Sequence, residues 1–340
     1  MKTTFLMITG SYPPDICGVG DYTKCFMDNA NDSWELYYSN SWNISTLVRK
    51  IKEINKYKCN NIIMQYPTQG YKWSLLPQLL CFYYSFFTKK KFTVVLHELS
   101  QRSTKAKLAT IFFFTANRII FTNEYERKYA IKRFKINPNK TDVIKIISNI
   151  EPASNIKSWN DRDIDLAYFG HLRPFKGLED FLNIASQLYK SQKIHISIIG
   201  QVLPEFKSYF EDLLQQYNIP ITLNLNLDSA KVSEKLNNTK VTFLPFPDGL
   251  SERRGSFLAA ISNGSLVVSY KGIFTTQELL GIFIPTEQET ASKDIFKILE
   301  ESDCNLFKSI QNNSLNYLKN SIPHSWKEIV FLYEKSINKI

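Results

Sequence analysis

The sequence contains no run of about 18 apolar residues, the length that a membrane-spanning helix requires. The apolar run within MKTTFLMITGSYPP is too short for a signal peptide and is expected to form a first buried strand. The five cysteines include no CxxC pair and no zinc-like spacing, which indicates reduced thiols in a cytosolic protein. The four histidines are scattered, and no Asp-x-Asp pair follows a predicted strand, so we expect no metal site.

Charge is distributed unevenly along the chain. Residues 1–150 hold 22 Lys and Arg against 10 Asp and Glu, and the remainder holds 20 against 22. A basic first half joined to a near-neutral second half indicates that the first half meets an anionic surface or ligand. The alternative is a solvated face of charged side chains with no partner.

Short strands rich in β-branched and aromatic residues alternate with amphipathic helical stretches, which is typical of a parallel sheet wrapped by helices. The pattern is interrupted by SNIEPASNIKSWNDRDID and then restarts, and the tail from about Ala291 is mostly helical. The predicted fold class is therefore α/β, with two doubly wound Rossmann-like domains facing each other across a cleft. The strands are expected near residues 3–8, 34–38, 61–66, 92–96, 118–122, 141–146, 165–170, 193–200, 221–226, 240–246 and 265–269.

In such sheets ligands bind beyond the carboxyl ends of the strands. After the first strand, Gly18 and Gly20 precede a helix, where backbone amides can hold a phosphate or a sugar hydroxyl, although a plain structural turn explains them equally well. Asp21 is a reasonable residue for the first turn of that helix. His97 and Glu98 follow another apolar run and should emerge at the same edge, where a histidine can donate to a hydroxyl.

Two basic junctions between a strand and a helix occur in the second half. In YFGHLRPFKGLEDF, Arg173 and Lys176 stand beside a helix start, so that amides, helix dipole and cations converge on one anion site. In PFPDGLSERRGSF, Arg253 and Arg254 precede Gly255 and Ser256 at a second helix start. Each charge-assisted hydrogen bond there is worth about 1.5–3 kcal/mol. Both junctions suit a diphosphate neutralised without Mg²⁺, and the alternative is surface cations on turns.

Taken together, these segments resemble a GT-B glycosyltransferase of family 4, in the family's order and over nearly the whole chain. CGVGDYT is similar to the family's N-terminal loop, and YFGHLRPFKGLEDF to its donor-phosphate signature. SIIGQVLPEF resembles its strand with a glycine-rich turn, and HSWKEIVFLYEKSI the final helix that crosses back to the first domain. His97 falls where the family often has an active-site histidine.

Two departures from the family pattern stand out. His171 occupies the position of the family's arginine, with Arg173 two residues later. The family's pair of glutamates, eight positions apart, aligns with Ser251 and Ala259, or with Glu252 and Ala260 after a shift by one. The usual ribose-binding glutamate is therefore missing or replaced. A subgroup of bacterial members shares this RRGS substitution and a QYP strand end, here Gln65 to Pro67, and these resemble enzymes of surface polysaccharide assembly.

The resemblance implies a retaining hexosyltransferase with no cofactor and no metal. The donor would be a UDP or GDP sugar, and the acceptor a glycan on undecaprenyl diphosphate, as in O-antigen or capsule synthesis. Candidate catalytic residues are His97, Arg173, Lys176 and Glu252. Candidate donor-diphosphate residues are Gly18, Gly20, Arg173, Lys176, Arg253, Arg254, Gly255 and Ser256, and candidates on the acceptor side are Asp21, Gln65 and Glu98.

The resemblance also sets the expected domains: an acceptor-side domain over 1–150, a linker over 151–163, a nucleotide-sugar domain over 164–322 and a returning helix over 323–340. Cations interleave with aromatics in CFYYSFFTKKKF and from Arg102 through KAKLATIFFF, as in interfacial segments, unless those aromatics form a helix core. We therefore expect a cytoplasmic protein with peripheral attachment to the anionic inner membrane surface.

Other functions remain open at this point. A GT-B partner or scaffold subunit without catalysis is the main alternative, because of the missing glutamate pair. Nucleic acid is not expected as a partner, since the charge is not gathered in a known recognition motif. The fold alone does not separate a transferase from an epimerase or a phosphorylase.

Overall fold

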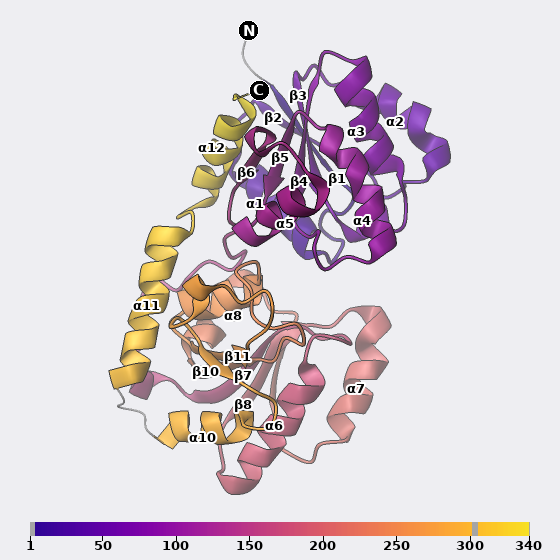
Figure 1. The fold of residues 1–340 in the computed structure, drawn as a ribbon. Coiled ribbons are helices and arrows are strands. Elements are labelled where there is room, and N and C mark those ends of the chain that lie inside the picture. The colour runs from indigo at the N-terminus through magenta and orange to yellow at the C-terminus, as the bar shows by residue number, and fades with distance from the viewer. Residues whose placement is uncertain (1–3, 301–304, 340) are drawn as a thin grey trace. The chain divides into compact units, whose positions relative to one another are not determined.

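The computed structural model describes residues 4–300 and 305–339. The chain divides into two compact units: unit 1 comprises Met1–Ile146 and Pro323–Ile340, and unit 2 comprises Ile147–Ile322. Each unit is built around a six-stranded, all-parallel sheet with helices on both faces (Figure 1). The predicted α/β fold class with two Rossmann-like sheets is confirmed.

Unit 1 has the strand order β2-β1-β3-β4-β5-β6. Its strands are β1 (Phe5–Thr9), β2 (Trp34–Tyr38), β3 (Asn61–Tyr66), β4 (Lys91–Leu96), β5 (Arg118–Phe121) and β6 (Thr141–Val143). Its helices are α1 (Gly18–Asn29), α2 (Leu47–Ile54), α3 (Leu76–Phe87), α4 (Thr104–Thr110), α5 (Glu124–Phe134) and α12 (Trp326–Ile337), with a 3₁₀ segment η3 (Ile111–Thr115) after α4.

Unit 2 has the strand order β12-β11-β10-β7-β8-β9. Its strands are β7 (Ile164–His171), β8 (Ile196–Gln201), β9 (Thr222–Leu225), β10 (Thr239–Leu244), β11 (Leu266–Tyr270) and β12 (Ile284–Thr286). Its helices are α6 (Leu178–Ser191), α7 (Lys207–Gln215), α8 (Ser229–Asn237), α9 (Gly255–Ser262), α10 (Ala291–Glu300) and α11 (Asn305–Ser321). The sequence did not predict β12, because three residues with a central proline lack a strand signal.

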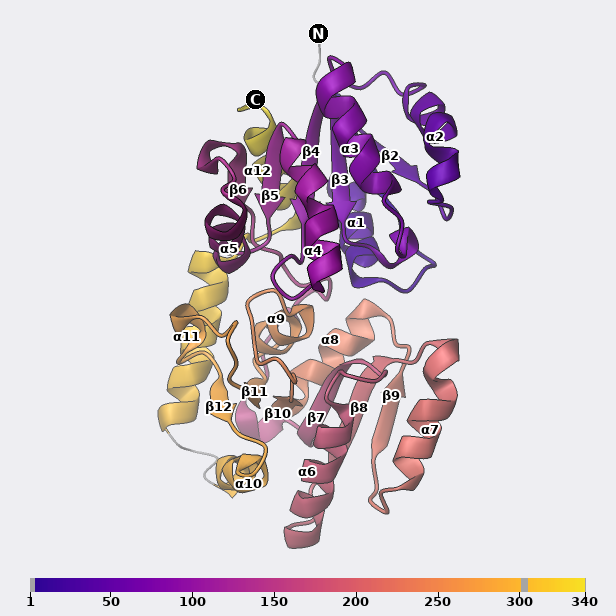
Figure 2. The ribbon, with the colours of Figure 1, turned by 45° about the vertical axis from the view of Figure 1, so that its right-hand side comes forward.

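Strands β1, β3, β8 and β10 are buried almost throughout because helices cover both faces of each sheet, so they read as nearly continuous apolar runs. In unit 1, α3 and η3 cover one face of the sheet, and α1 and α12 lie behind it (Figure 2). The final helix α12 is held there by Trp34, whose Nε1 donates to Glu334 Oε1 at 2.9 Å, and by Lys339 Nζ, 2.9 Å from Asp142 Oδ1. Residues distant in the sequence thus meet in one unit.

The segment predicted as a linker, 151–163, belongs to unit 2 and is anchored there. Arg162 is 2% exposed, and its guanidinium donates to the carbonyl oxygens of Thr239 at 2.8 Å and Asn263 at 3.2 Å. Its burial lowers the pKa of this guanidinium to about 10. The predicted strand over 3–8 begins at Thr3, which lies outside the described ranges, and Cys304 lies outside them too. The other four cysteines are free thiols.

Candidate functional site

The carboxyl end of the unit 1 sheet is shaped by a close approach of two loops. A Cβ on Gly70 would lie 1.6 Å from the carbonyl oxygen of Gly10, and Gly70 N donates to Ser11 Oγ at 2.8 Å. Gly20, buried in the first turn of α1, sits against the backbone of Ser11, where an added Cβ would be at 3.0 Å from the carbonyl oxygen. Gly18 begins α1 with open space around it. The helix start is therefore packed on one side and accessible on the other.

His97 lies at the end of β4 in a hydrogen-bonded aromatic cluster. Its Nε2 is 2.7 Å from Oε1 of Gln65, which is fully buried at the end of the neighbouring strand β3. Because Gln65 Nε2 contacts Met7 Sδ at 3.3 Å, its oxygen faces the histidine, an arrangement that suits the His97 tautomer with its proton on Nε2. The Tyr22 ring stands edge-on to the imidazole with centroids 5.3 Å apart. The structure thus brings together two predicted residues, His97 and Gln65.

The C-terminal helix completes this cluster. Tyr333 of α12 places its hydroxyl 3.1 Å from that of Tyr22, and both rings are buried. Burial raises the pKa of the Tyr333 phenol to about 12, while hydrogen bonding to Tyr22 and Gln65 acts in the opposite direction. Both phenols are therefore neutral at physiological pH: Tyr22 contacts the histidine ring, and Tyr333 hydrogen-bonds Gln65, the partner of that histidine. Neither tyrosine was predicted, since nothing in the sequence pairs positions so far apart.

Asp21 lies half-buried in the first turn of α1. Burial raises the pKa of its carboxyl to about 6. The helix dipole favours a carboxylate at this place, but desolvation outweighs that effect. Since the folded pKa exceeds the unfolded value, the stability that this group contributes is present below about pH 4 and is lost as the pH rises through about 6.

We therefore expect Asp21→Asn to raise the free energy of unfolding by about 1 kcal/mol at pH 7 and to have little effect near pH 4. Urea unfolding of both proteins at the two pH values measures the difference. Asp28→Asn on the same helix is the control, because exposed Asp28 pairs with Lys24 at 2.7 Å, and it should change stability by less than about 0.5 kcal/mol. An equal gain at both pH values would show that the carboxyl does not titrate as described.

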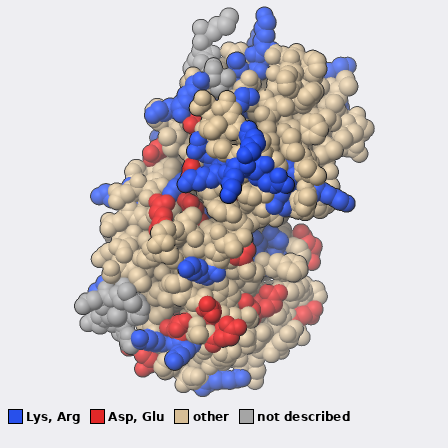
Figure 3. Space-filling view, viewed as in Figure 1, with Lys and Arg blue, Asp and Glu red and all other residues tan. Residues whose placement is uncertain are grey.

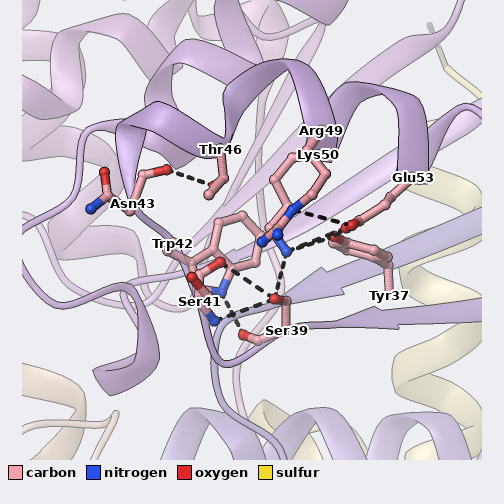
Figure 4. A network of polar contacts seen from close by, with 9 residues as sticks. All are labelled: Tyr37, Ser39, Ser41, Trp42, Asn43, Thr46, Arg49, Lys50 and Glu53. Carbon is pink, nitrogen blue, oxygen red and sulfur yellow. Dashed lines mark hydrogen bonds and ion pairs between the residues drawn. The ribbon is translucent and has the colours of Figure 1, made fainter.

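The loop after β2 reaches the same edge of the sheet and is held by a buried lysine (Figure 4). Lys50 is 2% exposed and donates to Tyr37 Oη at 2.9 Å and Ser39 Oγ at 2.5 Å. Its ammonium lies 3.4 Å from Glu53 Oε2 and 5.5 Å from the centre of the Trp42 ring. The ammonium is thus surrounded by oxygens and aromatic rings of the chain itself. We assign this network a structural role.

In unit 2 the loop between β7 and α6 carries the first predicted basic junction. Arg173 and Lys176 are half-buried, and both cations act electrostatically on His171 at the end of β7. Burial, with Lys176 and Arg173 adding to it, lowers the pKa of His171 to about 4, so the imidazole is neutral at pH 7. Its buried Nδ1 has no hydrogen-bond partner in the described chain. The neutral histidine therefore adds no charge where the resemblance leads one to expect an arginine.

Phe175, between these two cations, has an unusual backbone. Its φ is 64°, and its side chain is 89% exposed. Left-handed backbone costs a bulky L-residue about 1–2 kcal/mol, and such strain is common at functional sites. No sequence pattern predicts this conformation at a phenylalanine, since glycine or asparagine usually adopts it.

Replacing Phe175 by Gly should raise the free energy of unfolding by about 0.5–1 kcal/mol, because the strain disappears and little apolar contact is lost. Thermal or urea unfolding measures this. The control is Ile273→Gly, a comparably exposed residue (79%) without positive φ, which should be destabilised by a similar amount. If Phe175→Gly were destabilised as Ile273→Gly is, the claim that the backbone is strained at position 175 would be contradicted.

The second basic junction joins β10 to α9, and its two arginines diverge. Arg254, the N-cap residue of α9, pairs with Asp248 and lies over the Phe246 ring at 4.5 Å. Arg253 lies over Phe274, 5.8 Å from its centre. Asp248 therefore supplies an anion beside these two cations at the helix start. The first turn of α9 contains no acidic residue, and Gly255 has open space around it.

The two basic junctions adjoin each other. β7 and β10 are neighbouring strands, and a Cβ on Gly177 would lie 2.0 Å from the carbonyl oxygen of Pro245. Burial raises the pKa of the Tyr168 phenol, and the cations of Arg173 and Arg254 act in the opposite direction, so both guanidinium groups are within electrostatic range of one ring. Two helix starts and three basic side chains, those of Arg173, Lys176 and Arg254, thus gather at one end of this sheet.

The other predicted residues occupy a range of environments. Glu98 is exposed after β4, and Ser256 is half-buried in the first turn of α9. Glu252 is 6% exposed, and its charge raises the pKa of the Tyr317 phenol, after burial as the larger cause. It therefore lies beside α11, and Ala259 and Ala260 are buried within α9. Gly18, Gly20 and Asp21 belong to unit 1, while Arg173, Lys176 and the arginine pair belong to unit 2.

Within the described ranges, 4–300 and 305–339, no group of three or more His, Cys, Asp or Glu side chains could hold a metal ion. Among the helices of those ranges, none combines the length and the apolar character that crossing a bilayer requires.

No family model matches the chain, and no curated protein matches it significantly. Solved structures do. A glycosyltransferase from Rickettsia africae matches with a TM-score of 0.72 and 14% identity, over 99% of this chain and 98% of that one. HepE of Anabaena, solved with UDP and glucose, matches with a TM-score of 0.72 and 13% identity, over 99% and 100%. The pneumococcal O-GlcNAc transferase GtfA, solved with UDP and GlcNAc, has a TM-score of 0.57 and 14% identity, over 86% and 59%.

At these identities the likeness shows the fold. The chain shares the GT-B-like architecture of these structures over essentially its whole length.

Proposed function

We propose that this chain is a glycosyltransferase that moves a hexosyl group from a nucleotide sugar to a hydroxyl of a glycan, with retention of anomeric configuration. The observation that carries the proposal is the convergence of Arg173, Lys176 and Arg254 with the starts of α6 and α9 at neighbouring strands of unit 2. Backbone amides, helix dipoles and cations together suit the diphosphate of such a donor. The fold shared with HepE and GtfA, both solved with UDP, supports UDP as its nucleotide, and GDP is the alternative.

The leaving diphosphate is the centre of the proposed mechanism. As the glycosidic bond breaks, negative charge grows on the phosphate oxygens, and preorganised cations stabilise that charge without reorganisation. Arg173 and Lys176 supply this stabilisation, and the amides of Gly255 and Ser256 assist. Neutral His171 donates to or accepts from the donor. The departing phosphate accepts the acceptor's proton, so no protein base and no metal is required.

His97 binds the sugar side of the reaction from unit 1. Its Nε2 is occupied by Gln65, and the cluster with Tyr22 and Tyr333 holds the ring in one orientation. A fixed imidazole positions a hydroxyl rather than relaying protons. This agrees with a reaction in which the main requirement is the correct orientation of the reactants. Asp21 and Glu98 lie on the acceptor side. The acceptor we propose is an oligosaccharide on a lipid diphosphate at the cytoplasmic face of the membrane, in surface polysaccharide synthesis.

The alternative is a GT-B partner or scaffold subunit without turnover, favoured by Ser251 and Ala259 at the places of the family's glutamates. A thermal-shift titration separates the two: UDP or GDP stabilises an enzyme, and no shift with any nucleotide favours the scaffold. A panel of UDP and GDP sugars, assayed for release of free nucleotide with a lipid-diphosphate oligosaccharide as acceptor, then tests transfer. NMR of the product's anomeric proton tests retention.

A further inference from the structure

The outer side of unit 1 exposes a contiguous apolar surface. We call it the aromatic face and define it by six side chains: Phe82, Phe86, Phe87, Leu108, Ile111 and Phe112. They come from α3, α4 and η3 and are between 38% and 69% exposed. Their rings contact one another: the Phe82 centroid is 4.9 Å from that of Phe86 and 6.5 Å from that of Phe112.

This surface is additional to the core that α3 forms. Leu76, Leu80, Cys81 and Tyr84 turn inward, are fully buried and pack on the sheet. The exposed phenylalanines therefore do not hold the helix in place. Monomeric proteins rarely expose large contiguous apolar patches, and those that do use them for contact with a partner.

The aromatic face lies in a strongly basic part of the chain. Residues 67–123 contain eight Lys and Arg (Lys72, Lys89, Lys90, Lys91, Arg102, Lys105, Lys107 and Arg118) and a single acid, Glu98. Lys89 and Lys91 follow the end of α3 and are exposed, and exposed Lys105 precedes Leu108 by one helical turn. In Figure 3 the surface over α3 shows no acidic side chain, and basic ones lie at its margin.

We propose that the aromatic face docks on an anionic lipid bilayer, with Phe86 and Phe87 in the interfacial layer and Lys89, Lys91 and Lys105 against the lipid phosphates. Charge complementarity favours a membrane over a second copy of the chain as the partner of the aromatic face. A symmetric dimer through this face would bring the same lysines together and repel, whereas an anionic leaflet attracts each of them. Aromatic and cationic side chains interleaved on a helical surface are what interfacial binding requires.

The docking face deepens the proposed function, since a lipid-linked acceptor lies at such a surface, but its test does not involve turnover. Full-length protein is sedimented with vesicles of phosphatidylglycerol and phosphatidylethanolamine, and with phosphatidylcholine alone. We expect binding to the anionic vesicles and at least tenfold weaker binding to the neutral ones. Phe86→Ser/Phe87→Ser should weaken binding at least tenfold, and so should Lys89→Glu/Lys91→Glu.

Matched controls keep the assay specific. Phe331→Ser removes an aromatic side chain of unit 1 that is 59% exposed on α12, and Lys190→Glu/Lys193→Glu makes the same charge change on unit 2. Both should bind like wild type. In a separate readout, brominated lipids should quench the fluorescence that Phe86→Trp adds to that of the five native tryptophans, and should leave the fluorescence that Phe331→Trp adds unchanged. Equal vesicle binding by wild type and both face variants would overturn the proposal. It would also be overturned if the wild type did not bind vesicles but formed a concentration-dependent dimer that Phe86→Ser/Phe87→Ser abolishes. Failure of vesicle binding with intact nucleotide-sugar turnover would leave the proposed function standing.

Discussion

Replacing Arg173 and Lys176 together by alanine is expected to lower turnover at least a hundredfold, about 2.7 kcal/mol of transition-state stabilisation. Both side chains lie in the loop after β7 and are close enough to His171 to lower its pKa. Neither is needed for the core, so the loss should appear in catalysis and not in folding. Removing a single preorganised donor to a developing oxyanion commonly costs this much, and here two cations are lost.

The control for this result is Lys190→Ala/Lys193→Ala, which removes the same charge from exposed positions at the far end of α6. That variant should turn over like wild type. Arg254→Ala should have an intermediate effect, because Arg254 also pairs with Asp248 and its loss leaves that carboxylate without this partner. Near-normal turnover of the Arg173 and Lys176 double variant would contradict the assignment of these two residues to the donor diphosphate.

The second large effect is expected for Gly177→Ala, which should lower the free energy of unfolding by about 2–4 kcal/mol. Gly177 has φ of 80°, and an added Cβ would lie 2.0 Å from the carbonyl oxygen of Pro245. The contact is backbone against methyl group, so no side chain can rotate away. The substitution must separate the β7–α6 loop from the end of β10, and it should lower turnover together with stability.

Gly255→Ala is the matched control, because Gly255 also begins a helix at this edge but has no neighbouring atom within 4 Å of an added Cβ. It should stay within about 0.5 kcal/mol of wild type. Urea unfolding followed by circular dichroism measures both variants. Equal stability of Gly177→Ala and wild type would mean that the close contact between Gly177 and Pro245 does not hold the two basic junctions together.

The fold was largely predictable because parallel strands covered on both faces appear as apolar runs, and helices between them carry amphipathic spacing. Every predicted strand matches one in the structure to within a few residues. The exceptions have physical causes. β12 is too short to produce a pattern, and the polar segment that includes Arg162 packs on unit 2 through hydrogen bonds to carbonyl oxygens of distant residues, which composition does not reveal.

The candidate site was predictable where it depends on strand ends and not where it depends on side-chain direction. Gln65 and His97 end neighbouring strands, so their contact follows from the topology. The divergence of Arg253 and Arg254 depends on Asp248 and Phe274, and the left-handed backbone of Phe175 has no sequence signal. Whether the candidate residues act as assigned remains a prediction that the substitutions above test.

Binding of a nucleoside diphosphate tests the central claim most directly, because it needs neither the acceptor nor the correct sugar. Isothermal titration of UDP, and of GDP in parallel, into the full-length protein without added metal should give one site per chain. Affinity should fall at least tenfold in Arg173→Ala/Lys176→Ala, and Lys190→Ala/Lys193→Ala should bind like wild type. Binding of neither nucleotide, or equal binding by wild type and the Arg173 and Lys176 double variant, would contradict the account.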